Sequence, residues 1–280
     1  MTSILTNNGA MVALQTLQSV NNDLTDAQNQ ISTGKKVGTA SDNAAVWAIS
    51  KTMESDVSGF ESISDALAVG EATVAVASAG AEQIVDTLTD IKELVISAQS
   101  ENVDHATIQL DIAKKIEQID TIMAAAQFNG VNLLLDTVDG TASELGVLAS
   151  LDRIGPTGTP TATEITISAI DFTTNLDLSS MTAIADSSTA ATALGEIEAY
   201  LATAITGAAQ LGSDSARLSD QGEFVSKLSD AMKMGISTMT DTDMEEASAR
   251  LKALQTQQSL AVQSLTIANS APSTLSQLFR

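Results

Sequence analysis

Several residue types on which compact enzymes depend are scarce or missing in this chain of 280 residues. There is no cysteine, which excludes a disulfide framework and thiolate chemistry at a metal or as a nucleophile. Aromatic residues make up only 2% of the chain, and it contains only 3 prolines and 1 histidine. Compact cores usually contain aromatic side chains, whereas long packed helices can be built from Ala, Leu, Ile and Val. The scarcities therefore favour an extended helical protein over a compact enzyme.

Positive charge is scarce as well, because 13 Lys and Arg residues stand against 35 Asp and Glu residues, a formal net charge of −22. A field of this sign repels nucleic-acid phosphates and anionic lipid, so we expect no nucleic-acid partner and no membrane partner. No uninterrupted run of about 18 apolar residues occurs, and we expect no membrane span. Residues 1–30 lack the basic start and continuous apolar stretch of a cleaved signal peptide, so export would need another route.

What the chain does contain is a helical repeat near each end. Apolar residues recur there in alternating steps of three and four, the a/d spacing of a helix that packs along another helix. The N-terminal seam is Ala10, Ala13, Leu17, Val20, Leu24, Ala27 and Ile31; the C-terminal seam is Met244, Ala247, Leu251, Leu254, Ala261, Leu265 and Ala268, with Leu275 and Leu278 farther on. We expect the first helix to end at Gly34 and the last to end at Pro272.

Charged side chains are missing from the outermost part of both terminal segments, residues 1–22 and 253–279. A solvated helix usually covers its outer face with Lys and Glu. We therefore interpret the two segments as surfaces that are buried against other copies of the chain, with the two seams as the assembly seams. The alternative is an ordinary two-helix pair within one chain.

Between the ends, the spacing of apolar residues predicts a long helix over residues 46–98, which at about 1.5 Å per residue would approach 80 Å. A second helix is predicted over residues 108–126, short enough to fold back antiparallel on the first. The sequence Phe128-Asn129-Gly130-Val131 then predicts a β-hairpin. Helix is expected again from about Ala190 to Met239.

Residues 155–190 differ in character, with prolines and many threonines, and residues 164–170 alternate polar with apolar side chains as a strand does. We expect this segment to be a short, solvent-exposed, variable excursion. The predicted fold is mainly α, a long antiparallel helical rod with coiled-coil terminal helices, a β-hairpin and a small β-containing outer excursion. Its expected segments are 1–40 (inner N-terminal helix), 41–154 (helical rod with hairpin), 155–190 (excursion), 191–239 (returning helix) and 240–280 (inner C-terminal helix).

Three separated blocks resemble the bacterial flagellins. The first is Ile-Ser-Thr-Gly-Lys-Lys-Val at 31–37 with Ala-Ser-Asp-Asn-Ala-Ala at 40–45, the second is Gln-Phe-Asn-Gly-Val-Asn-Leu-Leu at 127–134, and the third runs from Thr240 to Arg280 with Ala-Asn-Ser-Ala-Pro at 268–272. The chain is similar to short alphaproteobacterial members, in which an aromatic residue follows the Asp-Asn-Ala-Ala block. The short excursion implies that the large outer domains of long flagellins are absent.

The resemblance implies a structural subunit that polymerises with itself into the helical filament used for swimming. In that family the terminal helices pair as a coiled coil inside a tube, and the subunit is exported to the cell exterior through the flagellar type III apparatus. The implied partners are other copies, the export apparatus and its chaperone, and the hook-associated and cap proteins. No cofactor or metal is implied. A contact repeated by one screw operation never closes and so produces a filament.

Three residues near the first block are candidates for contacts between subunits. Lys35 and Lys36 are cations in a strongly acidic chain and could meet the carboxylates of a neighbouring copy. Trp47 could pack where the long helix meets the terminal helices or against a neighbouring subunit.

A fourth candidate segment contains Asp90, Lys92, Glu93 and Leu94. It resembles the segment through which some flagellins are detected by an innate immune toll-like receptor, where the family has Arg at the position of Asp90. Because a reversed charge at a contact commonly costs several kcal/mol, we expect weak or absent detection.

The chemistry of an enzyme has little support in the sequence. His105 lacks the second histidine and the carboxylate of a zinc-protease helix motif, and we expect it at the surface. Asp241 and Asp243 lack the spacing of a calcium loop and more simply begin a helix. The alternatives that remain are a hook–filament junction protein, which shares similar terminal helices, and a secreted acidic coiled-coil adhesin.

Overall fold

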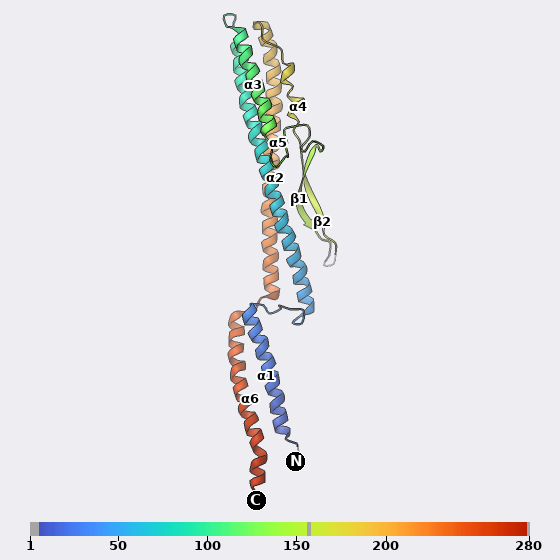
Figure 1. Cartoon of the computed structure of the whole chain (residues 1–280), viewed down its shortest axis with the longest axis vertical. Coiled ribbons are helices and arrows are strands. Elements are labelled where there is room, and N and C mark those ends of the chain that lie inside the picture. Colours follow the sequence, from blue (N-terminus) through green and yellow to red (C-terminus); the bar gives the residue numbers. More distant parts are fainter. Residues whose placement is uncertain (1–5, 156–157, 279–280) are drawn as a thin grey trace. The chain divides into compact units, whose positions relative to one another are not determined.

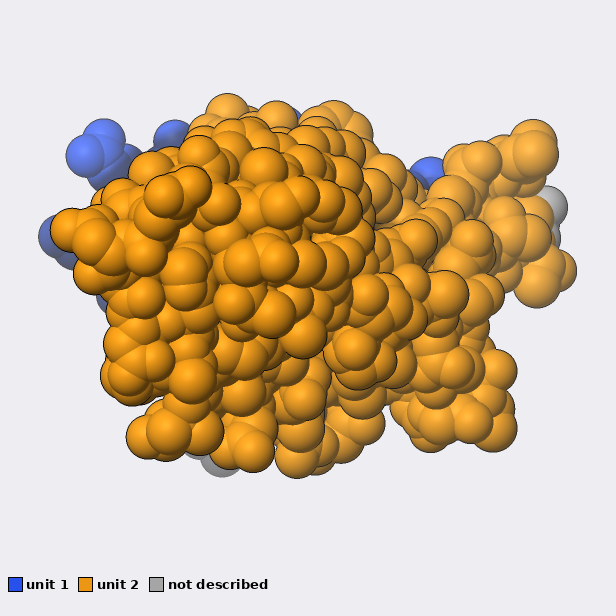
Figure 2. Space-filling model, turned by 90° about the horizontal axis from the view of Figure 1, so that it is seen from above, with its two compact units in different colours: residues 1–55, 231–280 blue, residues 56–230 orange. Residues whose placement is uncertain are grey.

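The structure is a computed structural model that describes residues 6–155 and 158–278, with residues 271–278 described in their backbone only. Its elements in chain order are α1 (Asn8–Thr33), α2 (Ala44–Ser97), α3 (His105–Ala125), β1 (Glu144–Asp152), β2 (Thr161–Ser168), α4 (Phe172–Asn175), a 3-10 turn η1 (Leu178–Ser180), α5 (Ser187–Thr240) and α6 (Met244–Leu278) (Figure 1). They form two compact units, residues 1–55 with 231–280 and residues 56–230 (Figure 2).

In the first unit, α1 and α6 lie side by side and run antiparallel (Figure 1). A small apolar core of Val20, Ala27 and Leu254, flanked by Leu24 and Leu251, joins the two helices. Helix α1 ends where expected, because Gly34 adopts a left-handed conformation with φ 70° that residues with a side chain rarely accept. The shared core of α1 and α6 confirms the predicted pairing of the terminal helices.

The second unit is built on α2, α3 and most of α5. The predicted long helix is confirmed: α2 has 54 residues, about 81 Å at 1.5 Å per residue. Its buried side chains follow the helical spacing and are at most 2% exposed: Ile63, Leu67, Val74, Ala77, Ala81, Ile84, Leu88, Ile91 and Val95. Two ion pairs lie at the surface beside this core, where Lys115 of α3 lies 2.6 Å from Asp90 and Lys92 lies 2.7 Å from Glu198 of α5.

Helix α2 is long and apolar enough to cross a membrane by length and composition, with a mean hydropathy of 1.2 over 18 residues. The expectation that no segment could span a membrane considered only uninterrupted apolar runs, and α2 is interrupted by glycine, serine and acidic residues. Val74, Ala77, Ala81 and Ile84 are fully or almost fully buried within the second unit. Packing inside the unit therefore accounts for the hydropathy of this helix.

The β structure differs from the prediction in position. Strand β2 is found at residues 161–168, close to the predicted 164–170, but its antiparallel partner β1 was not predicted. Asn129 and Gly130 do form a tight turn, with φ 52° and 84°, yet it is flanked only by an isolated bridge between Phe128 and Val131. The hairpin of this fold is thus β1–β2, with a bulge between Leu148 and Ser150.

The segment 155–190, expected to be an exposed excursion, is exposed at most of its described residues, but it also contains buried apolar side chains. Five apolar side chains after the hairpin loop are at most 4% exposed: Ile167, Phe172, Leu176, Leu178 and Ile184. Polar contacts also fix the segment, since Glu196 of α5 accepts hydrogen bonds from the backbone and hydroxyl of Thr182 at 2.7 and 2.8 Å. The sequence did not indicate the burial of the residues after Ile167, because these apolar residues are separated by threonine, aspartate and serine, without a helical or strand period.

Candidate assembly interface

The two terminal seams face each other within one chain. Val20, Ala27, Ala247 and Leu254 are 3–8% exposed, and Met244 is 46% exposed. The half-buried seam residues are Ala10, Ala13, Leu17, Leu24, Ile31, Leu251, Ala261, Leu265 and Ala268. The side chains of Leu275 and Leu278 lie outside the described residues. The two-helix pair within one chain thus describes how these seams pack here, and their part in contacts between copies stays a prediction.

The expected end of the last helix at Pro272 is wrong, because α6 continues to Leu278. Proline has no backbone N–H, so it cannot donate to the carbonyl of Ala268 four residues earlier. In this structure the side-chain amide of Asn7 donates to that carbonyl at 2.7 Å. The Oδ1 of Asn7 also accepts the N–H of Ala10 at 3.1 Å, which caps α1. One asparagine therefore begins α1 and satisfies the carbonyl that the proline leaves free.

The outer faces of the pair carry apolar side chains that the a/d spacing did not mark. On α1, Met11 and Val12 are each 64% exposed and Leu14 is 48% exposed. On α6, Leu260 is 56% and Ile267 64% exposed. The signal in the sequence was the missing charge, because these positions are interleaved with glutamine, serine and threonine rather than with Lys and Glu. An apolar surface of this kind is typical of an interaction site.

The loop between α1 and α2 is fixed to the end of α5 by backbone hydrogen bonds. The N–H groups of Lys36 and Val37 donate to the carbonyl of Thr240 at 2.6 and 3.2 Å, and Thr242 donates to Gly34 at 3.0 Å. Val37 is buried at 7% exposure. One hydrogen-bonded junction therefore joins the loop that follows α1 to the short connection between α5 and α6.

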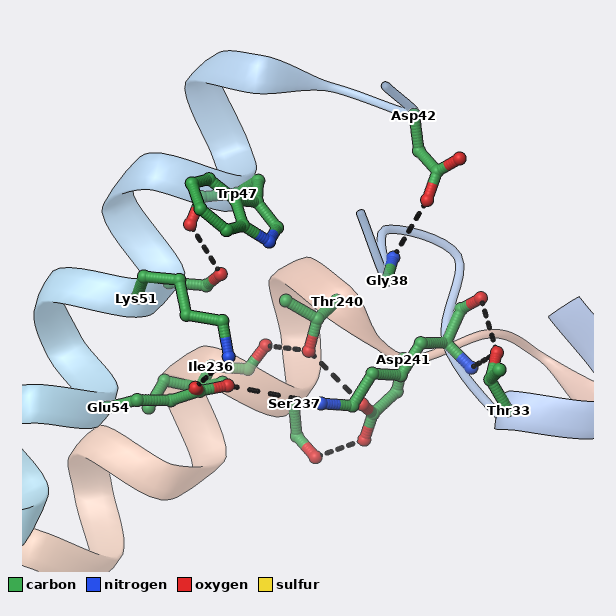
Figure 3. A network of polar contacts seen from close by, with 12 residues as sticks. Thr33, Gly38, Asp42, Trp47, Lys51, Glu54, Ile236, Ser237, Thr240 and Asp241 are labelled. Carbon is green, nitrogen blue, oxygen red and sulfur yellow. Dashed lines mark hydrogen bonds and ion pairs between the residues drawn. The ribbon is translucent and has the colours of Figure 1, made fainter. Parts of the chain in front are cut away.

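Lys35, a candidate for contact with a neighbouring copy, has an acidic neighbour within the chain. Its Nζ lies 3.9 Å from Glu54, which is also bound by Lys51 at 2.5 Å (Figure 3). The hydrogen bond from Lys51 is the main cause that lowers the pKa of Glu54. Lys36 is exposed, and Trp47 is partly exposed in the first turn of α2. A role of Lys35, Lys36 or Trp47 between subunits stays a prediction.

Asp42 shapes the same loop, because its carboxylate accepts the N–H groups of Thr39 at 2.8 Å and Gly38 at 3.0 Å. These bonds, that from Thr39 first, hold the pKa of Asp42 below its ordinary value of 3.8. A depressed pKa means that the carboxylate stabilises the fold at pH values above about 4 and loses this effect as the pH falls through the lowered pKa.

Asp42→Asn is therefore expected to lower the melting temperature of the first unit at pH 7 and to have a much smaller effect at pH 2–3. Thermal melts followed by circular dichroism at the two pH values measure this. The matched control is Asn43→Ala, which removes an uncharged cap on the N–H of Val46, 3.2 Å away. Its effect should be the same at both pH values, and equal pH dependence of the two variants would contradict the role of Asp42.

The segment that resembles the immune-receptor site contributes to two surface ion pairs of the second unit. Asp90 is paired with Lys115 and Lys92 with Glu198, while Glu93 is exposed and Leu94 is half-buried. The ion pair with Lys115 of α3 holds the carboxylate of Asp90 at the surface of the unit. The surface therefore carries a negative charge at the position where the family has Arg. Altered detection stays a prediction.

The residues considered for metal or catalytic chemistry have structural contacts. His105, the first residue of α3, is half-buried with Nε2 2.9 Å from the carbonyl of Ala98. Asp243 caps the start of α6 as expected, because its carboxylate accepts the N–H of Glu245 at 2.9 Å. The carboxylate of Asp241 instead accepts hydrogen bonds from the hydroxyl groups of Ser237 and Thr240 at the end of α5. Within residues 6–155 and 158–278, no group of three or more potential metal ligands occurs.

The chain matches known proteins over its whole length. Residues 4–139 match the bacterial flagellin N-terminal helical region and residues 194–279 match the bacterial flagellin C-terminal helical region. Flagellin FljO of Caulobacter vibrioides is 37% identical over 281 residues, covering 99% of this chain and 98% of that protein. A flagellin of Brucella melitensis is 38% identical over 287 residues, and Flagellin C of Rhizobium meliloti is 32% identical over 320 residues, each alignment covering both chains completely.

These matches agree with two features described above. The two terminal helices pair and have uncharged, apolar outer faces, and the three sequence blocks stand in the order expected for flagellins. The relatives have alphaproteobacterial sources, in agreement with the form of the first block. The chain belongs to the bacterial flagellin family, whose members are the structural subunits of the flagellar filament.

Proposed function

We propose that the α1–α6 pair is the polymerising part of this filament subunit and that its outer faces, rather than its seams alone, contact neighbouring copies. The observation that carries the proposal is the pair of faces themselves. The seam residues of α1 and α6 pack against each other within the chain, yet Met11, Val12, Leu260 and Ile267 remain at least 56% exposed. Burying one such side chain contributes about 1.5–3 kcal/mol, so a filament that covers them gains considerable stability.

The chain's charge supports this assignment. With a net charge of −22, copies repel one another in general, and close packing is easiest where neither copy carries charge. Residues 1–22 and 253–279 are the parts of the chain that meet this condition over an entire segment. A heterologous contact between such surfaces, repeated by one screw operation, extends without closing.

Val12→Glu tests the proposal, because it places a charge on the outer face of α1 without touching the seam. We expect the variant to fold and to fail to polymerise, as a buried unpaired carboxylate costs several kcal/mol. The measurement is sedimentation of polymer from the purified chain, with electron microscopy of the pellet.

The matched control is Gln28→Glu, which adds the same charge at an exposed position of the same helix, in the part that already contains Asp23 and Asp26. It should polymerise nearly as well as the unaltered chain. Filament formation by Val12→Glu at the normal yield would overturn the proposed role of the outer faces.

We further propose that the subunit is secreted through the flagellar type III apparatus, and that an export chaperone, the hook-associated proteins and the cap protein are its other partners. Membership of the flagellin family supports this. The role is structural, without catalysis. Matches over the complete length of several flagellins favour a filament subunit over a junction protein or an adhesin.

A further inference from the structure

Two phenylalanines of the second unit are exposed, which is unusual in a chain with only 2% aromatic residues. Phe60 and Phe172 are buried at 5% and 0% exposure, as expected of this residue type. Phe224 on α5 is 55% exposed, and Phe128 in the turn after α3 is 36% exposed. Large exposed apolar side chains that gather or protrude indicate an interaction site.

Phe128 lines an apolar groove of about 480 Å³ between α2, the turn at residues 128–131 and strand β1. Gly70 of α2 and Gly146 of β1 also line it and allow close packing there, because a Cβ at Gly70 would lie 2.8 Å from the side chain of Val147 and one at Gly146 would lie 2.8 Å from Oε2 of Glu164. Val69, 54% exposed, lies on one wall. Two carboxylates, those of Asp65 and Glu164, are also at the groove. It is therefore an apolar depression with acid at its edge.

Phe224 does not line this groove, and its exposed apolar ring lies near a cation rather than near carboxylates alone. Lys227 follows it by three residues and therefore shares its face of α5. The Lys227 side chain is 72% exposed and pairs with the exposed Glu223 of its own helix, at 2.7 Å. The α5 surface thus presents an apolar ring beside a cation, and the α2–β1 groove presents apolar walls beside carboxylates.

We infer that Phe224 of one copy inserts into the Val69–Phe128 groove of a neighbouring copy in the filament, with Lys227 placed toward Asp65 and Glu164. The inference rests on the proposed function and adds a contact in residues 56–230, away from the terminal helices. The two surfaces differ, so the contact is heterologous and can repeat from copy to copy without closing. Opposite charges at its edge set the register between chains that otherwise repel one another.

The absence of cysteine allows a direct test by cross-linking. One preparation carries Val69→Cys and another carries Phe224→Cys, both at exposed positions where the fold tolerates substitution. The two are copolymerised and oxidised with copper phenanthroline. We expect disulfide-linked dimers from the mixture, almost none from either variant alone, and a ladder of multimers from chains that carry both substitutions.

The matched control pairs Val69→Cys with Ile205→Cys, since Ile205 is an α5 residue of similar exposure, 50%, without a lysine three or four residues later. Its dimer yield should be several-fold lower. Filaments that form normally but give equal yields for the two pairs, or no dimer for Phe224→Cys, would overturn the inference and leave the proposed function intact. Failure of the unaltered chain to form any filament would instead contradict the proposed function.

Phe224→Ala gives a second readout. Because removing a buried aromatic contact at an interface is among the costlier substitutions, we expect the critical concentration for polymerisation to rise about tenfold. The melting temperature of the monomer should stay unchanged, as the ring is exposed there. An unchanged critical concentration would contradict the insertion of Phe224.

Discussion

Gly207→Val is expected to destabilise the second unit by about 3 kcal/mol or more, although valine is a better helix former than glycine. A Cβ at Gly207 of α5 would lie 2.5 Å from Cγ2 of Ile170 and 2.7 Å from Cε1 of Phe172. Phe172 is fully buried, and its backbone is fixed by a hydrogen bond from its N–H to the carbonyl of Leu134 at 2.8 Å. Neither neighbour can move without opening the core, so the segment after the hairpin must detach from α5.

The measurement is thermal or denaturant unfolding of the purified chain, in which a loss of this size lowers the melting temperature of a unit of this length by about 6–12 °C. Gly195→Val is the matched control, because Gly195 lies on the same helix and a Cβ there meets no atom within 4 Å. It should change stability by no more than about 0.5 kcal/mol. Similar effects of the two substitutions would show that close approach at Gly207 is not what holds the segment.

Ala27→Asp is expected to separate α1 from α6 and to abolish filament formation. Ala27 is 3% exposed in the apolar core with Val20 and Leu254, where a carboxylate would be buried among apolar side chains. An uncompensated charge in such a site costs about 3–5 kcal/mol, which a pair held by a small apolar core cannot absorb. Most of the stability of a helix in a protein comes from the packing of its apolar face, so α1 and α6 should lose structure as well.

Gln28→Asp is the control for this variant, because it introduces the same residue one position later, where the side chain is exposed. Circular dichroism of the monomer should show lost helix for Ala27→Asp alone, and sedimentation should show polymer for Gln28→Asp alone. If Ala27→Asp retained both full helix content and polymerisation, the seam would not be the contact that pairs these helices.

Helical spacing along the chain determined much of the fold. The steps of three and four from Ala10 to Ile31 and from Met244 to Ala268 predicted two paired helices, and the row from Val46 to Ala98 predicted α2. These predictions succeed because a periodic apolar face is a local property, repeated many times along one helix. The prediction that rested on a single residue, a helix end at Pro272, failed. The proline cannot donate a hydrogen bond to the carbonyl of Ala268, but the side-chain amide of Asn7, 261 residues away, donates to it instead.

The strand β1 and the buried segment after the hairpin could not be found in this way. Phe172 and Ile184 are buried because α5 and α3 provide surfaces for them. Gly207 of α5 leaves room for the ring of Phe172, and the side chain of Gln109 of α3 accepts the N–H of Ile184 at 2.7 Å. Nothing in the local sequence distinguishes such residues from apolar residues in an exposed loop. Their burial depends on contacts between segments that are distant in the chain.

By itself, the sequence determined a helical, strongly acidic chain with uncharged ends and the blocks of a filament protein, because composition and periodicity act residue by residue along the chain. Only the tertiary structure decided which apolar faces are already occupied. It places the seams of α1 and α6 against each other and leaves Met11, Val12, Leu260, Ile267 and Phe224 exposed. The physical reason is that a side chain is free to bind another copy only where no other part of its own chain covers it.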